Sequence, residues 1–391
     1  MKRIIYLDNA ATSFPKPRSV VSAIDRTVLR YCANPGRSSH PLALRAAEEV
    51  YGCRKRLATL FGGSEENVVF TLNATHAINL SLKATLKRGD HVLISDIEHN
   101  ALLRPVAELA ARGLITYGLF RSESDPERLT RELESRLQPN TALICACHHS
   151  NICNLCLPAR DIGRFCRSRG LLFLLDASQS AGSVPINIEN DCIDILCAPA
   201  HKGLYGIPGC GFAIFGSRLA DGKRLSTFVE GGNGVSSESP YMPDFLPERL
   251  EAGTLPLPAI SALSEGVRLV RRLGIPRIAE HERRLCAYAR RLLSEIDRIQ
   301  IHSQTDGSIL LFSVRGIESE DMASLLSQYG ICVRAGLHCA PLAHRWLGTP
   351  ADGAVRVSFG IFNTPADVLH LASACRRIVK KEPFGATIKS K

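Results

Sequence analysis

The sequence has no long hydrophobic run, and this absence excludes one class of protein. Its 391 residues are 45% hydrophobic and 22% charged, with a mean hydropathy of +0.02. No apolar stretch reaches the roughly 20 residues that a membrane-spanning helix needs. The short apolar run in MKRIIYLDNAATS is interrupted by Asp8 and Asn9, which is unlike a signal peptide. We therefore expect no membrane association and a cytoplasmic location.

Signatures of nucleic-acid and metal binding are also missing. The net charge is +10, but Lys and Arg are scattered in small clusters, which we interpret as solvated helix faces. Neither zinc-finger spacing nor interleaved aromatic and basic residues suggest a nucleic-acid surface. Four of the 14 cysteines lie close together without the spacing of a zinc or iron–sulfur site: Cys145, Cys147, Cys153 and Cys156. We expect no nucleic-acid partner, no metal and reduced thiols.

Short apolar strands alternate with amphipathic helices through the first two thirds of the chain. Strands are expected in ENVVFTL, HVLISD, NTALICACHHS, LLFLLDAS, IDILCAPA and GFAIFG. This alternation predicts an α/β fold with a mixed, mostly parallel sheet covered by helices. A stretch rich in Pro and Gly, 230–258, then predicts a long irregular connection, and connections of that length are usually functional.

The remaining residues predict a smaller domain. Two helical segments, ISALSEGVRLVRRLG and IPRIAEHERRLCAYARRLLSEI, precede the strands SILLFSV and AVRVSFG, with a helix near 318–329. Because 391 residues suit two domains, we expect a large domain, 1–257, and a smaller α+β domain, 258–391. The extreme N-terminus is expected to pack on the smaller domain.

Two charged residues follow strands in a pattern that suits an aldehyde cofactor. Asp176 ends the run LLFLLD, and ligands of open α/β sheets bind beyond the carboxyl ends of strands. Lys202 follows the next strand. A lysine can hold an aldehyde and a carboxylate can keep a pyridine nitrogen protonated, which is the pair that pyridoxal 5'-phosphate (PLP) requires. Each residue taken singly also has a structural interpretation. Asp176 suits the N-cap of a helix, and Lys202 suits an ordinary surface lysine.

Other side chains have the chemistry of a binding site, each with a structural alternative. Ala74 and Thr75 lie at a helix start in TLNATHAIN, which suits a phosphate or an ordinary cap. His99 follows a strand in SDIEHNAL and can stack on a ring or transfer protons, although a lone histidine is more often structural. Arg334 and Arg356 suit a substrate carboxylate, or lie on the surface.

One cysteine lies where a structural thiol is not expected. Cys339 occupies the loop VRAGLHCAPL, next to His338 and between Gly336 and Pro341, with apolar runs on either side. A structural cysteine is usually found inside such runs rather than between them.

In their order, the motifs LDNAAT, EHN, LDASQS, AHK, RLEAGT, RAGLHCA and VRVSFGIFNT resemble the class V aminotransferase family of fold-type I PLP enzymes. The resemblance spans nearly the whole chain and is closest to the group II cysteine desulfurases and selenocysteine lyases. It implies a homodimer that binds PLP and converts L-cysteine, or L-selenocysteine, to L-alanine. The sulfur would form a persulfide on Cys339 for a sulfur-acceptor protein, in iron–sulfur cluster assembly or another pathway.

The resemblance also implies roles for single residues. Lys202 resembles the Schiff-base lysine, Asp176 the partner of the pyridine nitrogen, and His99 the residue stacked on the ring. The other cofactor contacts that it implies are Gln179 at the ring oxygen, Ala74, Thr75 and His201 at the phosphate, and Thr254 from the second subunit. For the substrate it implies that Asn151 and Arg356 bind the carboxylate and that Cys339 accepts the sulfur.

The chain departs from the family pattern at five positions, one of which is Leu255 in place of a proline. Pro199 replaces the Ser or Thr that bonds the phosphate, and proline has no donor. Asn154 replaces a turn glycine, and asparagine tolerates the left-handed conformation that such a turn needs. Pro256 and Leu337 replace an asparagine and a histidine. These changes leave open a selenocysteine lyase, another PLP-dependent lyase or aminotransferase, and a catalytically weak sulfur-transfer scaffold.

Overall fold

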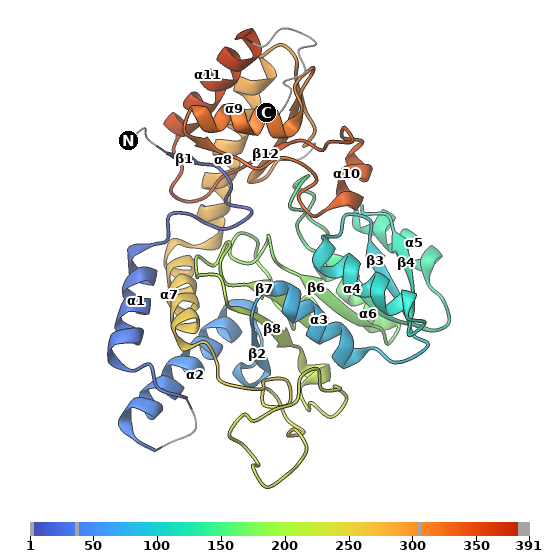
Figure 1. Cartoon of the computed structure of the whole chain (residues 1–391). Coiled ribbons are helices and arrows are strands. Elements are labelled where there is room, and N and C mark those ends of the chain that lie inside the picture. The colour runs from blue at the N-terminus through green and yellow to red at the C-terminus, as the bar shows by residue number, and fades with distance from the viewer. Residues whose placement is uncertain (1–3, 36–38, 304–305, 382–391) are drawn as a thin grey trace.

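A seven-stranded sheet forms the centre of the computed structural model, which describes residues 4–35, 39–303 and 306–381 (Figure 1). In order across the sheet, the strands are β2 (Val68–Thr71), β8 (Gly211–Phe215), β7 (Ile195–Pro199), β6 (Leu172–Asp176), β5 (Thr141–Cys147), β3 (His91–Ser95) and β4 (Thr116–Phe120). Only β8 runs antiparallel to its neighbours among these strands. The predicted mixed, mostly parallel sheet is confirmed.

Helices cover both faces of this sheet, which explains why its strands are almost wholly apolar. Side chains alternate along β6, so that Leu174 joins one core while Phe173 and Leu175 join the opposite one. The first core is covered by α3 (Ala74–Thr85) and α4 (Asn100–Ala111). The opposite core is covered by α2 (Pro41–Phe61), α5 (Pro126–Arg136), α6 (Ala159–Ser168) and α7 (Leu257–Leu273).

A second, smaller sheet lies at the top of Figure 1. It has the antiparallel order β12 (Val355–Ser358), β10 (Ile309–Val314) and β9 (Ile299–Ile301). The helices α8 (Ile275–Ser294), α9 (Ser319–Gln328) and α11 (Pro365–Lys381) share its core. The N-terminal strand β1 (Ile5–Tyr6) pairs in parallel with β11 (Ile331–Cys332), so Ile5 and Leu7 join this core. The boundary at residue 257 stays a prediction, and α7 packs on α2 and on α1 (Arg18–Arg30).

Several short or polar elements were not predicted, for physical reasons. The edge strand β4 has mostly solvent-accessible side chains, and α5 is built largely of charged residues with only two buried leucines. The strands β1 and β11 have two residues each, too few for a period to show. The remaining unpredicted elements are β9, α10 (Pro341–Leu347), α11 and the 3-10 turns at Glu65–Asn67 and Ser217–Leu219. Within the described residues no helix is long and apolar enough to cross a bilayer.

A long loop, residues 220–256, connects the two parts of the chain and carries Thr254. A buried ion pair fixes its end to the large sheet: Arg54 Nη2 lies 2.6 Å from Glu251 Oε2. The other oxygen of Glu251 accepts a hydrogen bond of 2.6 Å from the backbone N–H of Phe70 in β2. Arg54 also donates to the Val68 carbonyl. The pair therefore sets the position from which Thr254 projects.

We expect Arg54→Met to destabilise the protein by about 3–5 kcal/mol, because it leaves the Glu251 carboxylate buried without a counter-charge. Chemical denaturation measures the loss. The double variant Arg54→Met/Glu251→Gln should recover part of it, since glutamine keeps an acceptor for Phe70 and carries no charge. Arg131→Met, which removes an exposed pair with Glu127, should cost less than about 1 kcal/mol. Equal losses for the two single variants would contradict the role of the buried pair.

Candidate active site

One pocket opens at the carboxyl ends of β5, β6 and β7, where Cys147, Asp176 and Pro199 are the last residues. Most residues expected to bind the cofactor line it. The lining comprises Asn73, Ala74, Thr75, His99, Ala101, Cys147, Asn151, Asp176, Ser178, Gln179, Pro199, His201 and Lys202. Thr254 lies apart from it, exposed on its loop. The topology of the sheet thus brings together residues that are up to 129 positions apart in the sequence (73 to 202).

The lysine and the acid of this pocket form its central charge pair. Asp176 is buried, and its Oδ1 accepts a hydrogen bond of 2.9 Å from the Ser178 N–H. Burial lowers the pKa of Lys202 to about 8, while the Asp176 carboxylate acts in the opposite direction. At pH 7 about a tenth of the Lys202 side chains therefore carry an uncharged amine, far more than for a lysine with the ordinary pKa of about 10.4. An uncharged amine is the nucleophilic form that attacks an aldehyde.

The start of α3 forms the end of the pocket that suits an anion. Asn73 caps the helix, with its Oδ1 accepting from the His76 N–H at 2.9 Å. The first-turn amides of a helix, here at Ala74 and Thr75, have no intrahelical acceptors and attract negative charge. Gly211 in β8 allows this turn to approach, since a Cβ there would lie 2.5 Å from the Asn73 backbone. Pro199 lines the same pocket and offers no donor, so the anion must be held by other groups.

Histidine side chains at the pocket are uncharged. Burial lowers the pKa of His99 and of His201 to about 4. His99 also caps α4, because its Nδ1 accepts from the Ala101 N–H at 3.0 Å, which leaves the ring proton on Nε2. His201 Nδ1 is buried and has no hydrogen-bond partner among the described residues. These rings can stack on a flat group or bond to it without adding charge.

The backbone next to Lys202 is fixed by the N-terminal segment. The carbonyl of His201 accepts hydrogen bonds from Thr12 Oγ1, Ser13 Oγ and Lys16 Nζ at 3.0, 3.1 and 2.9 Å. In addition, Gln179 Nε2 donates to the Ala10 carbonyl at 2.9 Å. The motif LDNAATS thus positions the lysine, a role that its sequence alone did not indicate.

The buried guanidinium of Arg356, in β12, joins the small sheet to the pocket. Its Nη2 lies 2.7 Å from Asp8 Oδ1, and its Nη1 donates to the Asn151 carbonyl at 3.4 Å. Its Nε is buried and without a partner in the described part of the chain, as is Oδ1 of Asn151. Asp8 was missed at the sequence level as a functional residue. The signal that could have identified it is charge: a fully buried arginine requires an anion.

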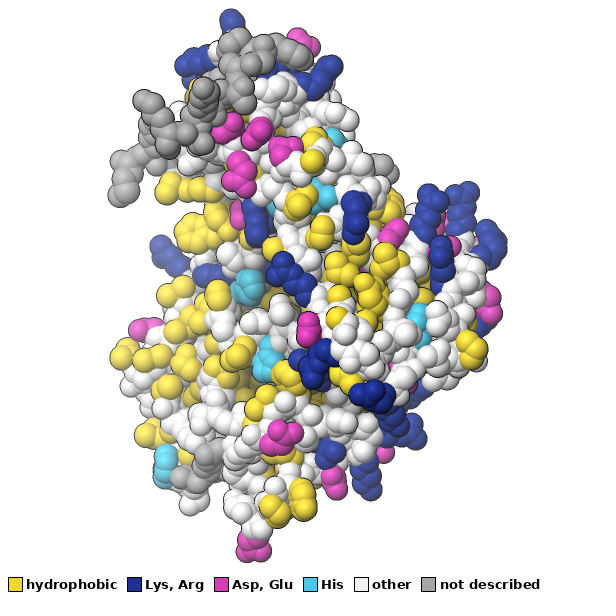
Figure 2. Space-filling view, turned by 45° about the vertical axis from the view of Figure 1, so that its right-hand side comes forward, with side chains coloured by type: hydrophobic (Ala, Val, Ile, Leu, Met, Phe, Trp, Pro, Cys, Tyr) yellow, Lys and Arg dark blue, Asp and Glu magenta, His cyan; other side chains and the backbone are white. Residues whose placement is uncertain are grey.

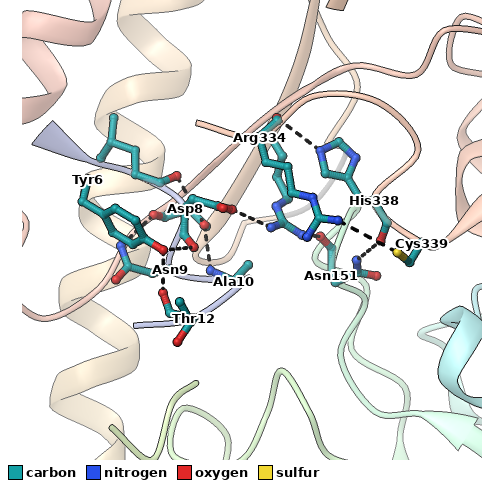
Figure 3. Close-up of polar contacts among 12 residues, drawn as sticks. Tyr6, Asp8, Asn9, Ala10, Thr12, Asn151, Arg334, His338 and Cys339 are labelled. Carbon is teal, nitrogen blue, oxygen red and sulfur yellow. Dashed lines mark hydrogen bonds and ion pairs between the residues drawn. The ribbon is translucent and has the colours of Figure 1, made fainter. Parts of the chain in front are cut away.

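The loop of Cys339 lies against the same group (Figure 3). Asn151 Nδ2 donates to the His338 carbonyl at 3.1 Å, and the Asn100 N–H donates to the Cys339 carbonyl at 2.7 Å. Arg334 Nη2 lies 3.9 Å from the exposed Cys339 Sγ. The cysteine and the two arginines do not line the pocket itself. Asn151 lines the pocket and bonds both to the loop of Cys339 and to Arg356, so it connects them to the pocket.

The turn that contains Asn154 has the conformation that the sequence predicts. Asn154 has φ 60°, in the left-handed region, so the replacement of glycine is tolerated. Its Oδ1 accepts a 3.0 Å hydrogen bond from the Ile309 N–H in β10. The Asn154 side chain thus bonds its turn to the small sheet, which a glycine could not do.

The cysteine cluster near the pocket has no metal-binding arrangement. Cys145, Cys147 and Cys153 are buried, and Cys156 is exposed. Among the described residues, no three His, Cys, Asp or Glu side chains are placed to hold an ion. All 14 cysteines of the chain are free thiols in the structure. Burial raises the pKa of the Cys147 thiol well above its usual range, which keeps it protonated beside the pocket.

Comparisons with known proteins agree with this arrangement. The chain is 31% identical to a probable cysteine desulfurase of Methanothermobacter thermautotrophicus, over 96% of this chain and 94% of that one. It superimposes on the apo structure of a cysteine desulfurase from Thermococcus onnurineus with a TM-score of 0.88, 28% identity and 97% and 95% of the two chains covered. An Escherichia coli cysteine desulfurase, CsdA, gives a TM-score of 0.86 at 27% identity, with the same coverage. The family model described as Aminotransferase class-V matches residues 5–371, and the chain belongs to this family.

Proposed function

We propose that this chain is a PLP-dependent cysteine desulfurase, which moves sulfur from L-cysteine to Cys339 and releases L-alanine. One observation supports this most directly. Asn151 lines the pocket of Lys202 and Asp176, and its amide holds the loop of Cys339. A nucleophilic thiol is therefore tied to a site that suits an aldehyde cofactor.

The pocket residues fit PLP. Lys202 would hold the aldehyde carbon, and Asp176 would face the pyridine nitrogen. The α3 amides at Ala74 and Thr75, with the unpartnered Nδ1 of His201, would bind the phosphate, whereas Pro199 would contribute nothing. His99 and Gln179 would contact the ring and its oxygen. Bound there, PLP supplies an electron sink for negative charge at the Cα of an amino acid.

The amino-acid carboxylate would lie against Arg356. Arginine binds carboxylates through parallel N–H donors, and its Nε is available while Asp8 occupies Nη2. Asp8 thereby orients the guanidinium and reduces the cost of burying it. Asn151 would complete the contact, and Arg334 would supply positive charge at the mouth of the site.

Sulfur transfer requires a thiolate on Cys339, and the guanidinium of Arg334, 3.9 Å from its Sγ, attracts that negative charge. The thiolate attacks the sulfur of the substrate. A sulfur–sulfur bond forms as the Cβ–sulfur bond breaks, and that electron pair passes to the carbon skeleton. Protonation there gives alanine. The persulfide on exposed Cys339 can then react with a thiolate of an acceptor protein.

A homodimer would complete the site, with Thr254 reaching the pocket of the other subunit. The outer faces of α1 and α2 support this proposal, since they expose large apolar side chains, with Leu29 74% exposed. The others in this apolar face are Val21, Val28, Leu42, Leu44 and Tyr51. Figure 2 shows hydrophobic side chains gathered on the flank at the left of the view. A cytoplasmic location stays part of the proposal, consistent with 14 free thiols.

The first test is release of alanine and sulfide from L-cysteine by the PLP-loaded protein with a reductant. We expect equal amounts, and a loss of about 100-fold or more in Cys339→Ala. Cys339→Ala should still bind PLP, since the cysteine lies outside the pocket. Cys32→Ala, which removes another exposed thiol, is the matched control and should behave as wild type. Unchanged release from Cys339→Ala would refute the role of this thiol, and release from L-selenocysteine alone would indicate a selenocysteine lyase.

PLP capture should depend on pH through Lys202. Because only the uncharged amine attacks the aldehyde, and burial lowers the pKa of Lys202 to about 8, capture by protein freed of PLP should speed up as pH rises through about 8. Asp176→Asn should move the midpoint lower, since the carboxylate favours the charged amine. Stopped-flow absorbance follows the lysine-bound cofactor, with Lys202→Ala as the control that forms none. A midpoint near that of free lysine, about 10.4, would contradict this environment.

Mixed dimers test whether Thr254 acts across the subunit boundary. Lys202→Ala lacks the amine, and Thr254→Asp places a carboxylate against the phosphate, so either homodimer should be inactive. A heterodimer isolated through two affinity tags should regain about half the wild-type activity, because one pocket then holds both native residues. If Thr254 acts within its own chain, the heterodimer stays inactive.

A further inference from the structure

We propose that His344, in α10, is a positioning residue that holds the Cys339 loop in place through His338. The hydrogen bonds of His344 in the described part of the chain reach no residue that lines the pocket, and the sequence did not indicate a role for it. The proposal rests on the proposed function, because the positioned thiol is the one expected to accept sulfur. Its structural part can nevertheless be tested without turnover.

The backbone of the loop needs such support. His338 and Cys339 have φ values of 51° and 56°, so two consecutive residues other than glycine adopt the left-handed conformation. L side chains rarely adopt it, and neither histidine nor cysteine has the backbone freedom of glycine. Such a conformation persists only where surrounding contacts impose it. The geometry of the Cys339 thiol therefore depends on whatever holds these two residues.

Two of the contacts that hold the loop come from the large domain. They are the Asn151 amide, on the His338 carbonyl at 3.1 Å, and the Asn100 N–H, on the Cys339 carbonyl at 2.7 Å. Both bind backbone oxygens and leave the His338 side chain to be fixed separately. That side chain is turned into the small domain and buried.

A chain of three hydrogen bonds fixes the His338 ring. Its Nε2 lies 3.2 Å from the Arg334 carbonyl, and its Nδ1 lies 3.2 Å from Nε2 of His344. The Nδ1 of His344 lies 2.7 Å from Oγ1 of Thr349. The two rings are nearly parallel, with 6° between their planes. Figure 3 shows the bond from His338 back to Arg334, the first of the three.

The carbonyl at the end of this chain determines the direction of every bond. A carbonyl only accepts, so His338 carries its proton on Nε2 and must accept at Nδ1. His344 therefore carries its proton on Nε2 and accepts at Nδ1 from the Thr349 hydroxyl. Both rings must be neutral for this, and burial lowers the pKa of His338 to about 3 and that of His344 to about 4. With the Thr349 hydroxyl proton directed to His344 Nδ1 at 2.7 Å rather than to the His344 carbonyl at 3.4 Å, one arrangement of protons satisfies all three bonds.

These three hydrogen bonds connect helix α10 to the strained loop of Cys339. Thr349 follows directly after the Gly348 that ends α10, and His344 is almost fully buried within the helix. The helix begins at Pro341, two residues after Cys339. From the helix, His344 thus bonds back to His338, the residue that precedes Cys339. This bond fixes the His338 ring relative to Arg334.

Two substitutions at His344 separate hydrogen bonding from packing. His344→Gln keeps an N–H donor close to the place of Nε2, whereas His344→Phe fills the space without a donor. We expect His344→Phe to slow single-turnover persulfide formation about tenfold or more, with the KM for L-cysteine and the PLP absorbance unchanged. His344→Gln should stay within about threefold of wild type. Thr349→Val, which removes the terminal donor, should fall between them.

Hydrogen–deuterium exchange gives a readout that needs no turnover. Backbone amides of residues 336–340 should exchange faster in His344→Phe than in His344→Gln or wild type. His91→Phe is the matched control: it removes another buried imidazole, in the first residue of β3, whose Nδ1 bonds to Thr141 Oγ1 at 2.9 Å and not to the loop. It should leave both the exchange at 336–340 and the persulfide rate unchanged.

Two results would overturn the proposal. Wild-type exchange and wild-type persulfide formation in His344→Phe would show that the loop holds itself. Equal impairment of His344→Phe and His344→Gln would show that the imidazole acts by packing. If the wild-type protein forms no persulfide, the proposed function fails, and exchange at 336–340 still decides whether His344 holds the loop.

Discussion

The ion pair of Asp8 and Arg356 is the interaction on which the site depends. It joins residues 348 positions apart in the sequence at 2.7 Å, and the arginine is only 2% exposed. A buried guanidinium without its anion is strongly destabilising, so the N-terminal segment must lie where Asp8 meets β12. That segment then continues to Thr12, Ser13 and Lys16, which bond to the His201 carbonyl next to Lys202. The small sheet and the lysine are thus positioned by the same stretch of chain.

Charge balance within the pocket follows from burial. Glu98 lies beneath the site, with Oε1 accepting from Ser95 Oγ at 2.5 Å and from the Cys147 N–H at 2.6 Å. Burial raises the pKa of Glu98 to about 8, so it is mostly protonated at neutral pH. The carboxylate of Asp176 therefore faces Lys202 without a second negative charge beside it. In the proposed function that carboxylate keeps the pyridine nitrogen of PLP protonated, and a neutral Glu98 does not compete for the proton.

The large sheet could be predicted from the sequence because each of its apolar strands is bounded by a turn or a helix. The residues that line the pocket could then also be predicted, since the carboxyl ends of neighbouring parallel strands lie at the same edge of the sheet. Contacts between distant segments could not be predicted in this way. Nothing local in LDNAAT distinguishes Asp8 as a partner of Arg356, and nothing in PLAHRWL indicates that His344 faces back to His338. Edge strand β4 and helix α5 were missed because their side chains are mostly solvated, so burial leaves no periodic pattern in the sequence.

The strained conformation of the Cys339 loop suits the proposed role of this thiol, which is to accept sulfur and then deliver it. A cysteine within a strand is held by a ladder of backbone bonds, and moving it would break several of them together. The loop instead depends on a few separate contacts: the Asn100 N–H, the Asn151 amide and the His338 ring. Each can be released singly, and release relieves the left-handed backbone, which offsets part of the cost of breaking these contacts. The contacts that fix the thiol therefore also impose a backbone strain, and this strain favours movement toward an acceptor once the contacts are released.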